Sequence, residues 1–426
     1  MKNILVNILF NNKIVKETVW SFFTKVITFG LFFLISIFLA RKLDVERFGL
    51  WSFFSASLSV ILFLSYFGIN ASSMKYVAQY SSTKSIRSVL WSSIKIRFFF
   101  SLVFCLFFLI CYKQLAYFLG RPELSTLFLL ATPLIFFSGL VEFLKNIFMG
   151  FHRNKYNFII NFLEYGLKLL LIICWLVFSD NLMSIINSYT LALLITSLVG
   201  FYLLYVNFYR GTERSEVKFS KEIINYSLPL FFISIGFWIA TEVDVVMLGM
   251  LAGDYQVGIY SIAKDIVLKL PHLSIALAMG TMPIFAKMNE ENKEEFKKIF
   301  YRLIKINTVI FVPITFFIIL FSGFFIPFLY GVKYSEAVLP LQLLSPFLLI
   351  FSYSAFFGTY LDYRGLAKKR AMNLVLTLVM NIVLNFILIP KLGAVGAAIG
   401  TSISYFPYSI LNWLEVKRSF KTNISK

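Results

Sequence analysis

Residues that usually hold metal ions are few in this chain, which has three cysteines and two histidines among its 426 residues. The cysteines are Cys105, Cys111 and Cys174. All three stand in apolar runs without the spacing of metal ligands, so we expect inert core residues. We expect His152 to be solvated, whereas His272 either fills a kink or titrates in a transport cycle. The sequence therefore predicts no metal site and no cofactor.

Charged residues are also scarce, at 14% of the sequence, whereas 59% of the residues are hydrophobic and 19% are aromatic. Soluble domains carry about 25% charged residues. Runs of about 20 apolar residues recur along the chain, and each is long enough to cross about 30 Å of hydrocarbon as a helix. This composition excludes a soluble domain and predicts an all-α integral membrane protein embedded in the lipid bilayer.

Twelve apolar runs are expected to form transmembrane helices, at 19–40, 48–69, 94–112, 125–149, 156–178, 183–206, 223–250, 257–284, 303–329, 339–361, 371–389 and 394–416. The basic segment before the first run has only a short apolar stretch, and no small-residue cleavage site follows it. We therefore interpret this segment as a cytoplasmic amphipathic lead-in to the first helix.

The 40 Lys and Arg residues, against 21 Asp and Glu residues, fall mainly in alternate gaps between the apolar runs. One set of gaps, which includes both chain ends and the gap from 70 to 97, holds 28 cations, and the other set holds seven. The positive-inside rule places the first set and both termini in the cytoplasm. The net charge of +19 is thus a signal of topology and not of nucleic-acid binding. The external gaps are too short for a catalytic domain, so we predict a protein that is not an enzyme.

The two halves of the chain resemble each other weakly. Each half has six runs, and the polar stretch 211–222 separates an N-terminal lobe, 1–212, from a C-terminal lobe, 213–426. A phrase near the start of the first half, Phe48-Gly49-Leu50-Trp51-Ser52, is matched by Val257-Gly258-Ile259-Tyr260-Ser261 in the second. Because six is an even number, the repeat is predicted to be parallel.

An ionisable residue within a membrane span costs about 2.5–3.5 kcal/mol on insertion scales, so each one needs a reason. Three lysines are candidate cations of a polar cavity that binds phosphate or diphosphate: Lys25, Lys264 and Lys269. Lys25 is the first choice because it has no acidic neighbour within its own predicted helix. Three carboxylates are candidate ion-coupling sites or charge partners: Asp244, Asp265 and Glu242. The alternative is that each lysine pairs with a nearby carboxylate and only supports packing.

Two further charge pairs favour a structural role. Glu164 and Lys168 lie four residues apart on one helix face and are predicted to form an ion pair. Glu142 and Lys145 lie near the cytoplasmic end of their span and are expected to extend to the membrane interface.

The segment NIVLNFILIPKLGAVGAAIG, residues 381–400, predicts a tight hairpin of packed helices. Asn381 and Asn385 share one helix face, and Gly396 and Gly400 allow close helix contact. This segment resembles the late helices of polysaccharide-type, Wzx-like flippases of the multidrug/oligosaccharidyl-lipid/polysaccharide (MOP) exporter superfamily. The phrase ARKLDVERFG at 40–49 resembles their first outer loop, and the stretch 244–263 resembles their helices 7 and 8.

The resemblance implies a MATE-like, V-shaped transporter of two six-helix lobes that works by alternating access. Its central cavity would be lined mainly by helices 1, 2, 7 and 8. The implied cargo is a polyprenyl-(di)phosphate-linked oligosaccharide, and other glycan-assembly membrane proteins are implied partners. The chain departs from relatives with a cationic helix 2, because no ionisable residue lies between Phe53 and Ile69.

Two other functions remain open at this point. A cation-coupled multidrug exporter of the same superfamily predicts an acidic cavity with Asp244 as an ion site. A membrane glycan polymerase or glycosyltransferase needs a sizeable extramembrane loop or an acidic metal-binding motif, and the sequence has neither.

Overall fold

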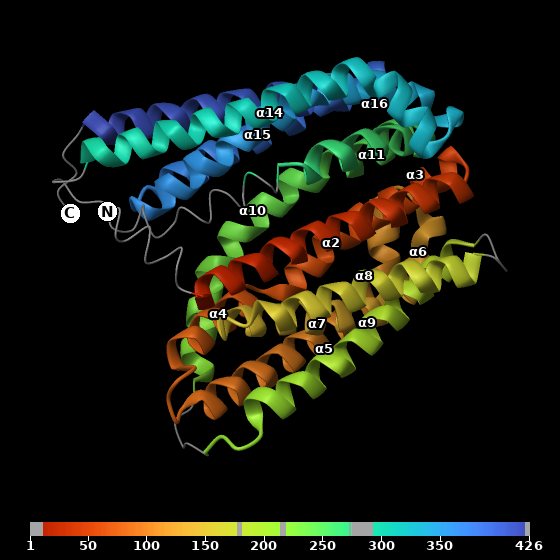
Figure 1. Cartoon of the computed structure of the whole chain (residues 1–426). Coiled ribbons are helices and arrows are strands. Elements are labelled where there is room, and N and C mark those ends of the chain that lie inside the picture. Colours follow the sequence, from red (N-terminus) through yellow and green to blue (C-terminus); the bar gives the residue numbers. More distant parts are fainter. Residues whose placement is uncertain (1–11, 177–180, 214–218, 272–273, 275–292, 422–426) are drawn as a thin grey trace. The chain divides into compact units, whose positions relative to one another are not determined.

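The protein is built from helices throughout residues 12–176, 181–213, 219–271, 274 and 293–421, which are the residues that the computed structural model describes (Figure 1). Nine helices in these ranges are long and apolar enough to cross a membrane. Their lipid-compatible composition explains why many large apolar side chains are exposed, since hydrocarbon replaces water around them.

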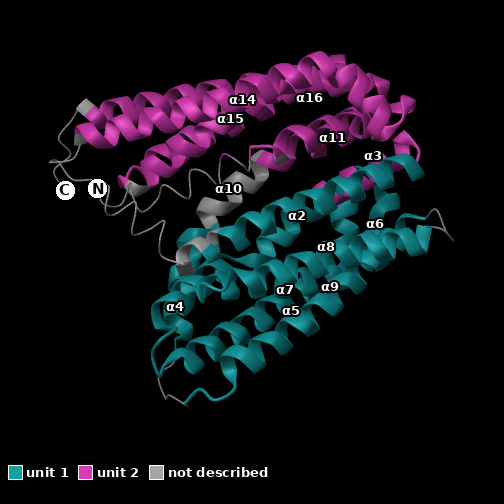
Figure 2. Ribbon diagram, viewed as in Figure 1, with its two compact units in different colours: residues 1–42, 57–235 teal, residues 43–56, 236–426 magenta. Residues whose placement is uncertain are grey.

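The chain divides into two compact units (Figure 2). Unit 1 comprises residues 1–42 and 57–235, and unit 2 comprises residues 43–56 and 236–426. Two helices, α3 (Val45–Tyr66) and α10 (Ser220–Ala252), therefore contribute residues to both units. The sequence predicts a lobe boundary in the polar stretch 211–222, whereas boundaries between the two compact units fall within α3 and α10.

The remaining helices of unit 1 follow one another along the chain (Figure 2). They are α2 (Asn12–Lys42), α4 (Ile69–Tyr80), α5 (Ile86–Phe118), η1 (Pro122–Leu124), α6 (Ser125–Leu130), α7 (Thr132–Gly150), α8 (Asn154–Leu176), α9 (Leu182–Leu204) and η2 (Tyr205–Tyr209). Helix α7 is central, because it packs against α4, α5, α8 and α9. Helix α2 packs against α8.

Unit 2 contains the remaining described helices, α11 (Asp254–Lys269), α14 (Lys293–Tyr330), η3 (Val332–Ala337), α15 (Val338–Tyr363) and α16 (Ala367–Lys421). Helix α15 packs against α11, α14 and α16 and so forms the middle of this unit.

Helix α16 reverses its direction at Gly393, whose φ of 55° is readily adopted only by glycine. Residues on its two arms then meet in antiparallel register: Asn373 contacts Asn412 at 2.8 Å, and Asn381 contacts Ser404 at 3.2 Å. A Cβ on Gly400 would lie 2.5 Å from the Asn385 side chain. The predicted hairpin is therefore confirmed, and α16 provides two of the predicted spans.

The predicted gap from 70 to 97 is shorter in the structure than the sequence suggested. Helix α4 occupies its first part, and α5 begins at Ile86 rather than at 94. Between α3 and α4 the chain breaks at Phe67 and Gly68, which have φ values of 47° and 68°. Arg97, where the predicted gap meets the predicted span 94–112, lies well inside α5.

Candidate functional site

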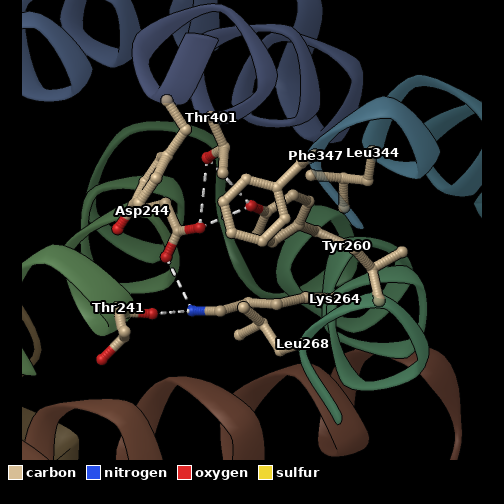
Figure 3. A pocket seen from close by; sticks show the side chains of 10 residues that line it. Thr241, Asp244, Tyr260, Lys264, Leu268, Leu344, Phe347 and Thr401 are labelled. Atoms are coloured by element: carbon tan, nitrogen blue, oxygen red, sulfur yellow. Dashed lines mark hydrogen bonds and ion pairs between the residues drawn. The ribbon is translucent and has the colours of Figure 1, made fainter. Parts of the chain in front are cut away.

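The most connected polar group in unit 2 is the ion pair of Asp244 and Lys264, on α10 and α11 (Figure 3). The Lys264 ammonium lies 2.7 Å from Asp244 Oδ1 and 3.4 Å from Glu242 Oε2. It also donates to the backbone carbonyl of Thr241. Both members of the ion pair are buried: Lys264 is 7% exposed and Asp244 is 3% exposed. Lys264 is thus fully partnered, with two carboxylates around one ammonium.

The carboxylate of Asp244 is occupied by donors on both oxygens. Its Oδ1 accepts from Lys264 and, at 2.8 Å, from the backbone N–H of Val245. Its Oδ2 accepts from the Tyr260 hydroxyl at 2.5 Å and from the Thr401 hydroxyl at 3.3 Å. An ionised carboxylate accepts about four hydrogen bonds, so these donors saturate Asp244.

The hydrogen bonds continue from Thr401 into the hairpin of α16. Asn381 donates to Thr401 at 3.4 Å, and Asn385 donates to Asn381 at 3.0 Å. The two asparagines are buried, at 2% and 0% exposure. The hairpin that the sequence predicted as a packing feature therefore also supports the polar site.

A small cavity adjoins the ion pair (Figure 3). Its lining combines the ion pair with apolar and aromatic side chains: Val267, Leu268, Leu344, Phe347 and Tyr405. The accessible volume is about 10 Å³, which is about the space of one water molecule. In this arrangement the site holds no space for a phosphate group.

Unit 1 contains a second charged cluster, centred on Glu164 of α8. Its carboxylate lies 2.5 Å from Lys168 and 2.7 Å from Lys145 of α7. The predicted pair of Glu164 and Lys168 is confirmed. The expectation for Lys145 is wrong: its side chain is only 12% exposed and binds Glu164 and, at 3.2 Å, Glu142, because these carboxylates compensate its burial.

Lys25 differs from every lysine in these clusters. It lies on α2 within an apolar span, its side chain is exposed, and it makes no hydrogen bond or ion pair with the residues that the structure describes. Its charge still interacts electrostatically with Glu142 and Lys145 in the same unit. An unpaired ammonium on the surface of a membrane span requires a polar surrounding, such as an aqueous cavity.

Arg97 is a buried charge at the position where the predicted gap 70–97 meets the predicted span 94–112. It is 0% exposed and donates to the Ser65 carbonyl at 3.1 Å and to Ser101 Oγ at 3.0 Å. Its Nη2 atom has no hydrogen-bond partner among the described residues. The guanidinium lies over the Tyr66 ring at 5.7 Å. The signal that could have revealed it is the sequence on its N-terminal side, where apolar residues extend the helical pattern back to Ile86.

The other predicted candidates are placed less completely. Asp265 is half-buried on α11. Lys269 ends the same helix, but its side chain and all of His272 lie outside the described residues. No group of three metal-binding side chains occurs in the described part of the chain. Cys174 is exposed and the other two cysteines are half-buried, so the expectation of core cysteines is wrong.

Comparison with protein families places the chain. Residues 14–289 match the family described as polysaccharide biosynthesis protein. The chain belongs to the polysaccharide biosynthesis protein family. Residues 229–387 also match the MatE family. Capsular polysaccharide biosynthesis protein CapF of Staphylococcus aureus is 25% identical over 316 residues, covering 71% of this chain and 77% of CapF. The probable low-salt glycan biosynthesis flippase Agl15 of Haloferax volcanii is 22% identical over 201 residues, covering 47% and 43%.

Solved structures show the same fold. An inward-facing multidrug resistance MATE family transporter of the MOP superfamily matches 93% of this chain and 96% of its own, with a TM-score of 0.77 and 17% identity. A MOP superfamily transporter from Pyrococcus furiosus matches 96% and 95%, with a TM-score of 0.71 and 17% identity. The predicted MATE-like helical fold is confirmed, and the chain is a multi-span membrane protein of the polysaccharide biosynthesis protein family.

Proposed function

We propose that this transporter moves a polyprenyl-(di)phosphate-linked oligosaccharide from the cytoplasmic to the outer leaflet of the cell membrane, by alternating access, for the assembly of surface polysaccharide or glycan. The names of two relatives support this cargo class, since CapF is a capsular polysaccharide biosynthesis protein and Agl15 a probable glycan flippase. The loop charges support termini in the cytoplasm. Other glycan-assembly membrane proteins are the expected partners.

The single observation that carries the proposal is Lys25. Its ammonium lies within a membrane span without an ion-pair partner among the described residues. A diphosphate is the kind of group that such an ammonium binds most strongly, because both charges gain from the contact. Lys25 is therefore the proposed first contact of the cargo headgroup.

The charge balance around Lys25 favours an anion. Four cations of unit 1 each interact electrostatically with Glu142: Lys25, Arg97, Lys145 and Lys168. Only two carboxylates, Glu142 and Glu164, oppose them in this group. The excess is two positive charges, which attract a diphosphate through a medium of low dielectric constant.

In unit 2 the proposed role of Lys264 depends on Asp244. The pair neutralises itself, so Lys264 can bind a phosphate only after Asp244 or Glu242 gains a proton or moves away. Asp244, with Glu242 beside it, is the proposed charge partner that releases Lys264 in the transport cycle. Lys269 and Asp265 follow Lys264 on α11, and we propose them as a further cavity cation and its charge partner.

A cation-coupled multidrug exporter is the second candidate function. The MatE match over residues 229–387 and the MATE structures favour it. It requires Asp244 to bind a coupling ion, but this carboxylate already accepts four hydrogen bonds, one of them from an ammonium group. The saturation of Asp244 therefore favours the lipid-linked sugar.

Reconstitution in vesicles tests the two functions against each other. Purified protein is placed in vesicles that contain a fluorescent polyprenyl-diphosphate sugar, and quenching of the outer leaflet measures its movement. The proposal expects movement with the intact chain and none with Lys25→Ala. Vesicles that instead export cationic dyes and leave the lipid-linked sugar in place would establish the exporter.

A further inference from the structure

The two repeated phrases of the sequence lie against each other inside unit 2. Gly49 stands in the first turns of α3, and Gly258 stands in the first turns of α11. A Cβ on Gly49 would overlap the carbonyl oxygen of Asp254 and lie 2.7 Å from the backbone nitrogen of Gly258. A Cβ on Gly258 would overlap the carbonyl oxygen of Val45. The two backbones are therefore as close as glycine permits.

This contact is reciprocal. Val45 precedes Gly49 by four residues, and Asp254 precedes Gly258 by four residues. Each glycine thus meets the carbonyl that lies one helical turn before the other glycine. Such a pairing has the geometry of a local twofold axis between the two helix ends. Small residues that face each other in this way let helices cross at backbone contact.

Neighbouring contacts hold the same end of α3 within unit 2. The Phe48 ring meets the Tyr334 ring edge to face, with centroids 5.9 Å apart. The Lys333 ammonium donates to the Leu43 carbonyl at 2.5 Å. Further along, the Phe53 ring lies so close to Gly249 of α10 that a Cβ there would be 2.6 Å from its Cε2 atom. These contacts explain why residues 43–56 belong to unit 2 while the rest of α3 belongs to unit 1.

We propose that the crossing of Gly49 and Gly258 is the external seal of the transport pathway, and that residues 43–56 separate from α11 when cargo leaves. This proposal rests on the transport function above and on the external position that the loop charges predict for this end of α3. The seal excludes water, because Val45, Phe48 and Val257 beside it are buried. The close approach at the crossing is mainly between backbone atoms, with the Val45 side chain also beside Gly258.

A reporter cysteine tests whether the crossing is a seal. The three native cysteines are replaced by alanine, and Val257, which is 0% exposed, is replaced by cysteine. Labelling by a membrane-impermeant maleimide added outside intact cells is expected to be low. Gly49→Ala is expected to raise it several-fold, because the added methyl group separates the helices. Gly323→Ala is the control, since nothing lies within 4 Å of a Cβ there.

A cross-link tests the same seal without crowding the crossing. Asp44 and Lys333 are exposed and interact electrostatically, and each is replaced by cysteine in the cysteine-free chain. A short bis-maleimide is expected to abolish movement of the lipid-linked sugar in vesicles, and a monofunctional maleimide to leave it intact. Transport that continues in the cross-linked protein overturns the seal.

The two readouts separate this proposal from the proposed function. Labelling of the Val257 cysteine requires no cargo. Unchanged labelling in Gly49→Ala overturns the seal even if the chain moves lipid-linked sugar. Raised labelling in a chain that moves no such sugar supports the seal and overturns the cargo assignment.

Discussion

Lys264 and Asp244 form an ion pair of 2.7 Å inside unit 2, and each removes the charge that the other could offer to a ligand. The pair is not symmetrical in its surroundings. Asp244 keeps three further donors if the lysine is lost, whereas Lys264 keeps the Glu242 carboxylate if the aspartate is lost. This asymmetry determines what each substitution does.

Lys264→Met is expected to destabilise the protein more than Asp244→Asn. The methionine leaves two carboxylates, Asp244 and Glu242, without a cation, and a buried charge that loses its partner costs about 3–5 kcal/mol. Asp244→Asn leaves Lys264 paired with Glu242, so it is expected to reduce stability less than Lys264→Met does. The check is the melting temperature in detergent, followed by size-exclusion chromatography.

The double variant Asp244→Asn/Lys264→Met is the control for this prediction. It removes both charges together and is expected to recover part of the stability lost in Lys264→Met. Equal losses in all three variants would show that packing, and not charge pairing, dominates this site.

Lys25→Ala is expected to abolish surface-glycan export while the protein remains folded in the membrane. Lys25 is classed as exposed and makes no hydrogen bond or ion pair with the described residues, so we expect the loss to fall on cargo binding. The measurement is complementation of an export-deficient strain, with protein levels in the membrane determined in parallel. Lys298→Ala is a matched control, because that lysine is also exposed but lies near the N-terminal end of α14. Export at the wild-type level in Lys25→Ala would remove Lys25 from the proposed cargo site.

How far the sequence could predict the site depends on the range of the interactions. The pairing of Glu164 with Lys168 was predictable because both lie on one helix. The hairpin at Gly393 was predictable because two asparagines and two glycines recur at helical spacing. The second partner of Glu164, Lys145, belongs to another helix, and which helix faces meet is decided by packing over the whole unit.

Arg97 and Tyr260 are two further residues whose contacts could not be predicted from the sequence. Arg97 stands near the start of the predicted span 94–112, and only the packing of α5 against α7 places its side chain in the interior. Tyr260 belongs to a repeated sequence motif, but its hydroxyl on α11 donates to Asp244 on α10. Periodicity predicts the exposed and buried faces of a helix and not the partner of a polar atom.

Gly139→Ala is expected to destabilise unit 1 through Arg97. A Cβ at Gly139 would overlap the guanidinium Nη2 atom and lie 2.8 Å from Cζ, so the guanidinium must leave its contacts with Ser65 and Ser101. Arg97→Lys is expected to be harmful as well, because a single ammonium cannot reproduce the geometry of the guanidinium. The readout is the melting temperature. Gly166→Ala, with nothing within 4 Å of a Cβ, is the matched control and should leave it unchanged.

Glu164→Gln is expected to destabilise the protein more than Glu142→Gln, although both remove one negative charge from the same cluster. Glu164 has a side-chain exposure of 8% and lies between two ammonium groups, whereas Glu142 has an exposure of 37% and contacts one. The loss at Glu164 leaves Lys168 buried without a carboxylate, for which a cost of about 3 kcal/mol or more is expected.

The effect of salt distinguishes this explanation from a loss of packing. Ions screen exposed charges and hardly affect buried ones. Raising the ionic strength should therefore reduce the difference in melting temperature between wild type and Glu142→Gln, and leave the difference between wild type and Glu164→Gln in place. Substitution of the stranded lysine in Glu164→Gln/Lys168→Met should then restore stability, because the buried charge that remained is removed. Failure of this second substitution to restore stability would mean that Lys168 reaches water or another partner, and the cluster would then be a surface network and not a buried one.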